Sequence, residues 1–243
     1  MGKTLISPSA ENDMSDDSVV FVVDDDDSLR RSLERLLRVN GHNVESFSSA
    51  SAFLARPDPG VPCCLVLDIR MPSLSGLDVQ RAVNEAGRAL PVVLMTGFAD
   101  VESCVVGMKA GAADFLLKPF DESQLLRSVT AALIQSAETR RTRGVRADIE
   151  KRLAGLTPRE RQVFWLVVKG MLNKQIAGQL GTKEGTIKLH RANVMRKLNA
   201  QSVADLVRMA DRLEGSSSMP SRPVDVRRAQ LDPLRAAPTA PAH

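Results

Sequence analysis

Short apolar runs alternate with amphipathic stretches along the first half of the chain. The apolar runs are Val19–Val23, Val44–Phe47, Cys64–Leu67, Val92–Met95 and Phe115–Leu117. Runs of this length, bounded by polar or turn-forming residues, predict buried strands, and the intervening stretches carry apolar residues at helical spacing. Five strands that alternate with five helices predict an α/β domain with a doubly wound, flavodoxin-like parallel sheet.

The second half of the chain has helical spacing only. Thr157, Pro158 and Glu160 form a helix start, with Thr157 as the N-cap and Pro158 in the first helical position. Further helices are predicted over about Asn173–Leu180, Glu184–Asn199 and Ser202–Leu213. Two short helices joined by a glycine turn, the second of them basic, are typical of a helix-turn-helix unit. The pattern alone leaves a plain helical bundle with a solvated basic face as the alternative.

Changes in composition divide the chain into five parts. Polar, unpatterned sequence predicts disorder at both ends, and an Arg-, Thr- and Glu-rich stretch predicts a linker between the two folded parts. This linker is expected to extend the fifth helix, with a break near Gly144. The predicted parts are 1–18 (disordered), 19–134 (α/β domain), 135–153 (linker), 154–213 (small all-α helix-turn-helix domain) and 214–243 (disordered). The folded pattern begins just after Met14, which is therefore an alternative start.

The net charge of +4 hides a strong asymmetry between the two folded parts. Residues 19–134 contain 11 Lys/Arg against 15 Asp/Glu, whereas residues 140–213 contain 17 against 6. The resulting net charges of −4 and +11 indicate nucleic acid as a partner of the second part. A solvated basic surface is the alternative interpretation of the charge alone.

Composition also limits the class of protein. No apolar run approaches the roughly 18 residues that a membrane helix needs, and the first residues lack the apolar centre of a signal peptide. The three cysteines, Cys63, Cys64 and Cys104, have no metal-binding spacing, so we expect reduced thiols that fill the core rather than redox sensors. These features predict a cytoplasmic protein with no membrane partner.

Three carboxylates follow predicted strands and are expected to meet at one edge of the sheet. Asp24 and Asp25 end the first strand, and Asp68 ends the third before a Met-Pro turn. Parallel strands place such residues together at their carboxyl ends. Like charges packed together are costly unless a cation neutralises them, and Mg²⁺ prefers oxygen ligands. Asp26 and Asp27 are expected to face the first turn of the next helix instead.

Thr96 and Lys118 follow two further strands and extend this chemistry. A phosphoryl group on Asp68 would need a cation and a hydroxyl donor on the side opposite the metal. Lys118 offers the positive charge and Thr96 offers the hydroxyl. Together with the carboxylates they predict a metal-assisted phosphoryl site.

Four segments of the first half resemble the receiver domains of two-component response regulators, especially the FixJ-like branch. They are Val-Val-Asp-Asp-Asp-Asp, Leu-Val-Leu-Asp-Ile-Arg-Met-Pro, Leu-Met-Thr-Gly and Phe-Leu-Leu-Lys-Pro-Phe. The resemblance spans about 19–134 and implies that Asp68 accepts phosphate from a histidine kinase. It implies that Asp25, Asp68 and the backbone carbonyl of Arg70 bind Mg²⁺, with Asp24 assisting through water. It also implies that Thr96 follows the phosphate, that Phe115 turns inward, and that the Lys118–Pro119 peptide is cis.

The basic half resembles the LuxR/NarL-type DNA-binding domain over roughly 155–213. The matching segments are Leu-Thr-Pro-Arg-Glu-Arg, Asn-Lys-Gln-Ile-Ala and Thr-Ile-Lys-Leu-His-Arg-Ala-Asn-Val-Met-Arg-Lys-Leu. The resemblance implies that Lys188, Leu189 and Ala192 face base edges in the major groove. It implies phosphate or edge contacts for four further residues, which are Lys174, Arg191, Asn193 and Lys197. The last helix, about Ser202–Leu213, resembles the dimer helix of that family.

The start of the recognition helix departs from the family pattern. Thr182, Lys183 and Gly185 stand where the family has an apolar residue, a serine N-cap and an alanine. Loss of the cap and the added glycine each cost about 1 kcal/mol, so Thr182 is considered as a cap one residue early.

The two resemblances together imply a transcription regulator that is phosphorylated on Asp68, forms a homodimer, binds promoter DNA and acts with RNA polymerase, more often as an activator. Any catalysis would be confined to phosphorylation and dephosphorylation of the receiver itself. One alternative is an aspartyl-phosphate enzyme of the haloacid-dehalogenase kind, which needs a second Asp where this chain has Arg70. The other is a DNA-binding protein that works without phosphorylation.

Overall fold

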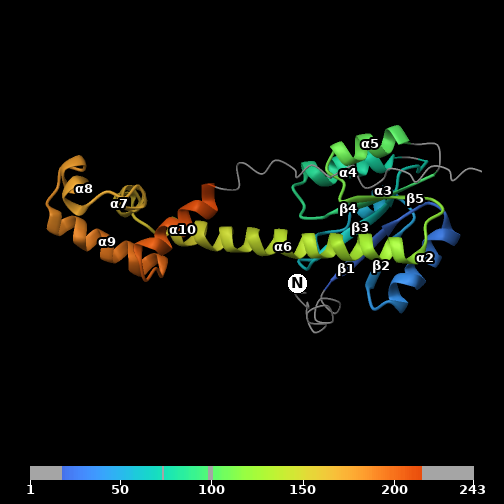
Figure 1. The fold of residues 1–243 in the computed structure, drawn as a ribbon, viewed down its shortest axis with the longest axis horizontal. Helices are drawn as coiled ribbons and strands as arrows, with labels where there is room; N and C mark the ends of the chain where they lie inside the picture. Colours follow the sequence, from blue (N-terminus) through green and yellow to red (C-terminus); the bar gives the residue numbers. More distant parts are fainter. Residues whose placement is uncertain (1–17, 73, 98–100, 215–243) are drawn as a thin grey trace, which may run out of the picture.

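The computed structural model describes residues 18–72, 74–97 and 101–214, without the side chains of 101–104. Two folded parts lie at opposite ends of one long helix, α6 (Glu122–Ala154), as Figure 1 shows. The segments predicted to be disordered lie outside the described residues, apart from Ser18 and Glu214. Among the helices that the structure describes, none combines the length and the apolar character needed to cross a lipid bilayer.

The first part is built on a parallel sheet of five strands in the order β2-β1-β3-β4-β5. The strands are β1 (Val19–Val23), β2 (Asn43–Phe47), β3 (Cys63–Asp68), β4 (Val92–Thr96) and β5 (Asp114–Leu117). Each lies within one residue of its predicted bounds. The order is that of a flavodoxin-like sheet, so the predicted fold class is confirmed. The long apolar runs are explained by helices on both faces, which leave β3 buried along its whole length.

Five helices cover the two faces of the sheet. The helices α2 (Asp27–Val39) and α6 pack on one face, where Leu33, Leu37, Leu125 and Val129 join the strand residues in a core. The other face is covered by α3 (Ala50–Leu54), α4 (Gly76–Glu85) and α5 (Val101–Lys109). Cys64 is wholly buried in the first core and Cys63 is buried in the second, and neither forms a disulfide, as expected of core residues.

The helix α6 continues through the whole predicted linker without a break at Gly144. The predicted break is therefore wrong, although the predicted helical extension is confirmed. Ion pairs one turn apart, Glu138–Arg141, Arg146–Glu150 and Asp148–Arg152, flank the glycine. Each such pair contributes a few tenths of a kcal/mol, and together they offset most of the roughly 1 kcal/mol that a helical glycine costs.

The first part of the predicted linker is fixed to the α/β domain. The buried hydroxyl of Ser136 accepts a hydrogen bond from the backbone N–H of Cys63 (3.1 Å) and donates one to the carbonyl of Ala89 (3.0 Å). Arg140 forms an ion pair with Asp58, and Arg143 donates to the carbonyl of Gly87 at 2.7 Å. These contacts extend the α/β domain about nine residues beyond its predicted end.

The second part is a bundle of four helices, α7 (Pro158–Val168), α8 (Asn173–Gln179), α9 (Glu184–Leu198) and α10 (Val203–Glu214). Phe164, Ile176, Ile187 and Leu206 lie in its core, against which Leu153 from the end of α6 also packs. The predicted helices are confirmed within one residue at each end.

An ion pair between a buried glutamate and a partly exposed lysine connects α7 to α9. Glu160 completes the capping box of α7, because its carboxylate accepts the N–H of Thr157 (2.8 Å) while the Thr157 hydroxyl accepts the N–H of Glu160. The same carboxylate oxygen lies 2.7 Å from Nζ of Lys197. The Lys197 hydrogen bond, aided by that of Thr157, lowers the pKa of Glu160 to about 2.

This pKa predicts that acid destabilises the helical domain. A carboxyl group whose pKa is lowered on folding stabilises the fold above its unfolded pKa, here 4.5, and loses that contribution as the pH falls toward 2. We expect Glu160→Gln to lower the free energy of unfolding by about 1.5–3 kcal/mol at pH 7 and by less at pH 3. Trp165, the one tryptophan of the chain, reports unfolding of this domain by fluorescence.

The matched control is Glu150→Gln, because Glu150 also forms an ion pair, with Arg146, but its side chain is 53% exposed. It should change the stability by less than about 0.5 kcal/mol at either pH. Equal losses in the two variants would contradict the assignment of the acid sensitivity to Glu160.

Candidate functional site

Polar side chains from four neighbouring strands meet at the carboxyl edge of the sheet. Asp24 follows β1, Asp68 ends β3, Thr96 ends β4 and Lys118 follows β5. The strand register pairs Val23 with Leu67, which brings Asp24 beside Asp68. Parallel pairing therefore gathers residues that are up to 94 positions apart in the sequence.

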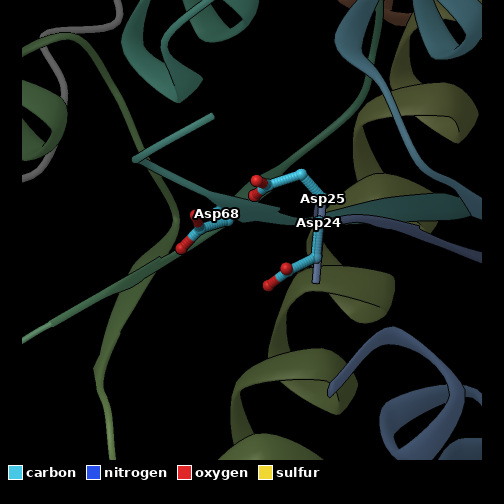
Figure 2. Close-up of side chains that lie close together, drawn as sticks. All are labelled: Asp24, Asp25 and Asp68. Atoms are coloured by element: carbon cyan, nitrogen blue, oxygen red, sulfur yellow. The ribbon is translucent and has the colours of Figure 1, made fainter. Parts of the chain in front are cut away.

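Three of the predicted residues form a cluster of carboxylates. Asp24, Asp25 and Asp68 each offer an oxygen within 4.8 Å of the other two, and Figure 2 shows their side chains close together. Asp24 and Asp68 are buried, with 1% and 7% of their surface exposed, whereas Asp25 is exposed. Two buried carboxylates and one that opens to solvent could hold a hard divalent cation that keeps part of its water shell.

Lys118 links the two buried carboxylates. Its Nζ lies 2.8 Å from Asp68 Oδ1 and 3.0 Å from Asp24 Oδ2. Burial alone would lower the pKa of Lys118, but the hydrogen bonds to Asp68 and Asp24 outweigh this effect and raise it. The ammonium is therefore held in its charged form next to the oxygen atoms on which chemistry is predicted. The peptide bond between Lys118 and Pro119 is cis, as expected.

The carboxyl group of Asp68 is the perturbed acid of the site. Burial raises its pKa above the ordinary value and the charge of Asp24 adds to this, although Lys118 and the N–H of Arg70 act in the opposite direction. The Arg70 N–H donates to Asp68 Oδ2 at 3.2 Å. The predicted role of the Arg70 carbonyl as a metal ligand stays a prediction.

The remaining two residues of the acidic run serve the helix that follows. Asp26 is the N-cap of α2 and accepts the N–H groups of Ser28 and Leu29. Asp27 forms ion pairs with Arg30 and Arg31. The expectation that Asp26 and Asp27 face the helix and not the site is confirmed.

Gly76 is a part of the site that sequence reasoning did not identify. It begins α4 directly behind Asp68, and a Cβ atom added there would lie 2.4 Å from the Asp68 carbonyl oxygen. The N–H of Gly76 also donates to the carbonyl of Ile69 at 2.9 Å. Only glycine lets the helix approach β3 this closely. A glycine soon after the Met-Pro turn was the available signal.

The site is open to solvent on one side. A groove of about 500 Å³ runs beside Asp25 and is lined by Ile69, Arg70, Met71 and Ser75, among others. Thr96, at the end of β4, is fully buried, and its hydroxyl donates to the carbonyl of Gly97 at 3.4 Å. Phe115, on the last strand, is 44% exposed and therefore points outward.

The predicted nucleic-acid contacts of the helical domain fall into two groups. Lys174, Lys188, Leu189 and Ala192 are exposed on α8 and α9. The other predicted contacts make hydrogen bonds within the domain: Arg191 donates to Asn173 Oδ1 (2.8 Å), Asn193 accepts from Arg196, and Lys197 is bound to Glu160. The first group is free to meet a ligand without breaking a strong internal contact.

The first turn of α9 has no side-chain cap. The N-cap residue is Lys183, which makes no capping hydrogen bond, and the helix begins with Glu184. The alternative in which Thr182 caps the helix one residue early is therefore wrong. The register of α9 is held from its buried side instead, by Ile187, Val194 and Leu198 in the core.

Two family models match this chain. Residues 20–130 match the response regulator receiver domain, and residues 154–210 match the bacterial regulatory proteins of the luxR family. The two matches correspond to the α/β domain and the helical domain.

Several relatives match this chain over most of their own length. The response regulator protein TodT of Pseudomonas putida is 43% identical over 199 residues, which cover 82% of this chain and 88% of TodT. The transcriptional regulatory protein FixJ of Azorhizobium caulinodans is 47% identical over 194 residues, which cover 79% of this chain and 90% of FixJ. Among solved structures, a low-resolution structure of the response regulator StyR is 44% identical, with a TM-score of 0.73, and covers 81% of this chain and 99% of its own.

Three observations indicate the same family: the carboxylate cluster with its bridging lysine, the helical domain, and these relatives. The chain belongs to the two-component response regulators that join a receiver domain to a LuxR-type helix-turn-helix DNA-binding domain.

Proposed function

We propose that Asp68 accepts a phosphoryl group from the phosphohistidine of a sensor histidine kinase. The observation that carries this proposal is the contact of Lys118 with Asp68 at the open edge of the sheet, beside two further carboxylates. The Asp68 carboxylate attacks phosphorus while the bond to the histidine nitrogen breaks. Lys118 then neutralises charge on the outer oxygens of the transferred group, with the Thr96 hydroxyl as a further donor.

Mg²⁺ is the cation that suits this cluster. Asp25 and Asp68 would bind it together with the backbone carbonyl of Arg70, and Asp24 would act through a bound water. Carboxylate oxygens with open positions for water fit the preferences of this ion. When bound, Mg²⁺ neutralises the carboxylates and the incoming phosphate. The receiver supplies the rest of the chemistry for its own phosphorylation and dephosphorylation.

Phosphorylation acts on DNA binding through a change of surface. The acyl phosphate draws Thr96 inward, and Phe115 turns from its exposed position into the space that Thr96 leaves. The surface of α5 and β5 already exposes Val105, Val106 and Leu117. A shape change in this apolar patch favours a homodimer, which places two helical domains on one promoter. RNA polymerase recruitment and activation follow as the expected outcome.

The complete phosphoryl site also separates this proposal from a DNA-binding protein that ignores phosphorylation. Such a protein has no need for a lysine held between two buried carboxylates. Removing these charges from water costs several kcal/mol, which apolar residues at the same positions would avoid. The haloacid-dehalogenase alternative lacks its second Asp, since Arg70 occupies that position. The Asp68 site is therefore best explained as a regulated phosphoacceptor.

Acetyl phosphate tests the phosphoacceptor directly. We expect the wild-type chain to gain the mass of one phosphoryl group in the presence of Mg²⁺, and Asp68→Asn to gain none, because an amide cannot form the acyl phosphate. Intact-mass spectrometry at neutral pH measures both. Asp26→Asn is the matched control, since asparagine keeps the helix cap, and it should be labelled like the wild type. Labelling of Asp68→Asn to the wild-type extent would refute the assignment.

Calorimetry tests the metal site. We expect Asp25→Asn to weaken Mg²⁺ binding at least about tenfold, because it removes one charged oxygen ligand from the cluster. Asp26→Asn, which lies one residue further along, should bind Mg²⁺ like the wild type. Undiminished binding by the Asp25 variant would mean that the cation lies elsewhere.

Salt titrations test the DNA interface. Binding of double-stranded DNA should weaken steeply as salt is added, because lysine–phosphate contacts release counterions. Lys174→Ala, at a predicted phosphate contact, should weaken binding for all sequences and reduce the slope by about 1. Arg35→Ala, an exposed cation on α2 of the receiver, is the control and should leave the slope unchanged. Acetyl phosphate should strengthen binding by the wild type and not by Asp68→Asn. A flat salt response would argue against the DNA interface.

A further inference from the structure

The exposed face of α9 presents a stripe without polar side-chain atoms. Gly185, Leu189 and Ala192 lie at positions i, i+4 and i+7, so they share one face of the helix, and all three are exposed. In a helix-turn-helix domain the N-terminal half of the second helix enters the major groove and meets the base edges. The stripe therefore contains no group that can form a hydrogen bond with a base.

Basic residues lie beside this stripe. Lys188 is exposed next to it, with Nζ 3.6 Å from Glu184, and Arg191 is held toward α8 by Asn173. Lys197 is bound to Glu160 in the domain. Cationic groups suit the phosphates along the groove, which fix the position of a protein on DNA but carry no sequence information directly. Of these three, only Lys188 is exposed without a strong internal contact, so it is the one that can reach phosphates or base edges.

Leu189 is the feature of the stripe that protrudes. Its surface is 61% exposed, although it belongs to a helix whose other large apolar residues, Ile187, Val194 and Leu198, are buried. One turn before it stands a glycine and one turn after it an alanine, so the larger side chains next to it, Thr186 and Asn193, flank it on one side only. The apolar group that the major groove offers is the C5-methyl of thymine.

Gly185 provides an independent observation. A Cβ atom added there would meet nothing within 4 Å, and its backbone has an ordinary helical conformation, so the fold does not require glycine. A glycine in a helix is nevertheless destabilising relative to alanine. A surface that must come very close to another molecule explains the choice, because the missing Cβ lets the first turn approach.

We propose that this chain recognises its DNA site through thymine methyl groups that pack on Leu189, with Gly185 allowing the start of α9 to enter the groove deeply. This inference rests on the proposed DNA-binding function and specifies its chemistry. Within the stripe, recognition is by apolar contact and shape, and any hydrogen bond to a base comes from polar residues beside it, such as Lys188 and Asn193.

The expected size of the effect follows from the area of one methyl group. Burial of a methyl or methylene group contributes about 0.8 kcal/mol, which corresponds to a roughly fourfold change in affinity for each thymine that Leu189 contacts. Uracil differs from thymine by this methyl group alone, so substitution of deoxyuridine removes the contact and leaves every hydrogen-bonding group of the base in place.

The experiment uses the full chain with acetyl phosphate. A bound site is selected from a random duplex library, and each thymidine of that site is then replaced in turn by deoxyuridine. We expect one or two replacements to weaken wild-type binding about fourfold each and the others to have no effect. In Leu189→Ala the same replacements should cost less than about 1.5-fold, because the methyl group has lost its partner. The two changes together form a double-mutant cycle.

Two further variants separate this inference from a general loss of binding. Lys188→Ala should weaken thymine and uracil duplexes by the same factor and leave the difference between them intact. Gly185→Ala should raise the melting temperature of the helical domain and at the same time weaken binding severalfold. Selection of no duplex would refute the proposed function and this inference with it. Binding that is insensitive to uracil at every position, or an equal uracil effect in Leu189→Ala, would overturn this inference alone.

Discussion

The carboxyl edge of the receiver sheet depends on the contact of one ammonium group with two buried carboxylates. Lys118 reaches Asp24 and Asp68 across strands that the fold places side by side, and without a cation these carboxylates would repel each other. The parallel order β2-β1-β3-β4-β5 is what gathers the three side chains. In the proposed mechanism, the phosphoryl group on Asp68 would be neutralised both by Lys118 and by a metal ion held by the carboxylates. The same charges that destabilise the unliganded edge therefore prepare it for its ligand.

The path from this edge to the DNA-binding domain runs through a single helix. On its receiver side α6 is fixed by Ser136, Arg140 and Arg143, and at its far end Leu153 packs into the helical core. Between these anchors only a few residues of exposed helix remain, and ion pairs support them. In the proposed dimer, a continuous helical connection of this kind would let the receivers determine the separation of two recognition helices, which must match the helical repeat of DNA.

The sequence predicted the fold, and the clustering of Asp24, Asp25, Asp68 and Lys118, well, because both depend on local signals. Apolar runs marked all five strands within one residue, and each candidate of the receiver stood at a strand end, where parallel topology leaves little choice of place. The predicted break at Gly144 was wrong because the glycine is evident in the sequence, whereas the ion pairs on either side of it form only once the helix brings their side chains together. The role of Gly76 was missed for a related reason: its closeness to the Asp68 carbonyl is a contact between helix and strand that no periodicity reveals.

The helical domain shows the limit of this approach more clearly. Seven DNA contacts were predicted from position in a motif. In the structure, however, Lys197 forms an ion pair with Glu160 and Arg191 donates a hydrogen bond to Asn173. Both contacts hold α9 against α7 and α8, so the basic count of this helix overstates the charge that is free for DNA. What remains exposed at the centre of the reading face is Leu189, between two small residues. In the proposed interface, the two kinds of side chain therefore act differently. Cations at the margin of the DNA-binding face provide affinity that salt can screen, and the apolar side chain at its centre provides discrimination between bases that salt leaves largely unchanged.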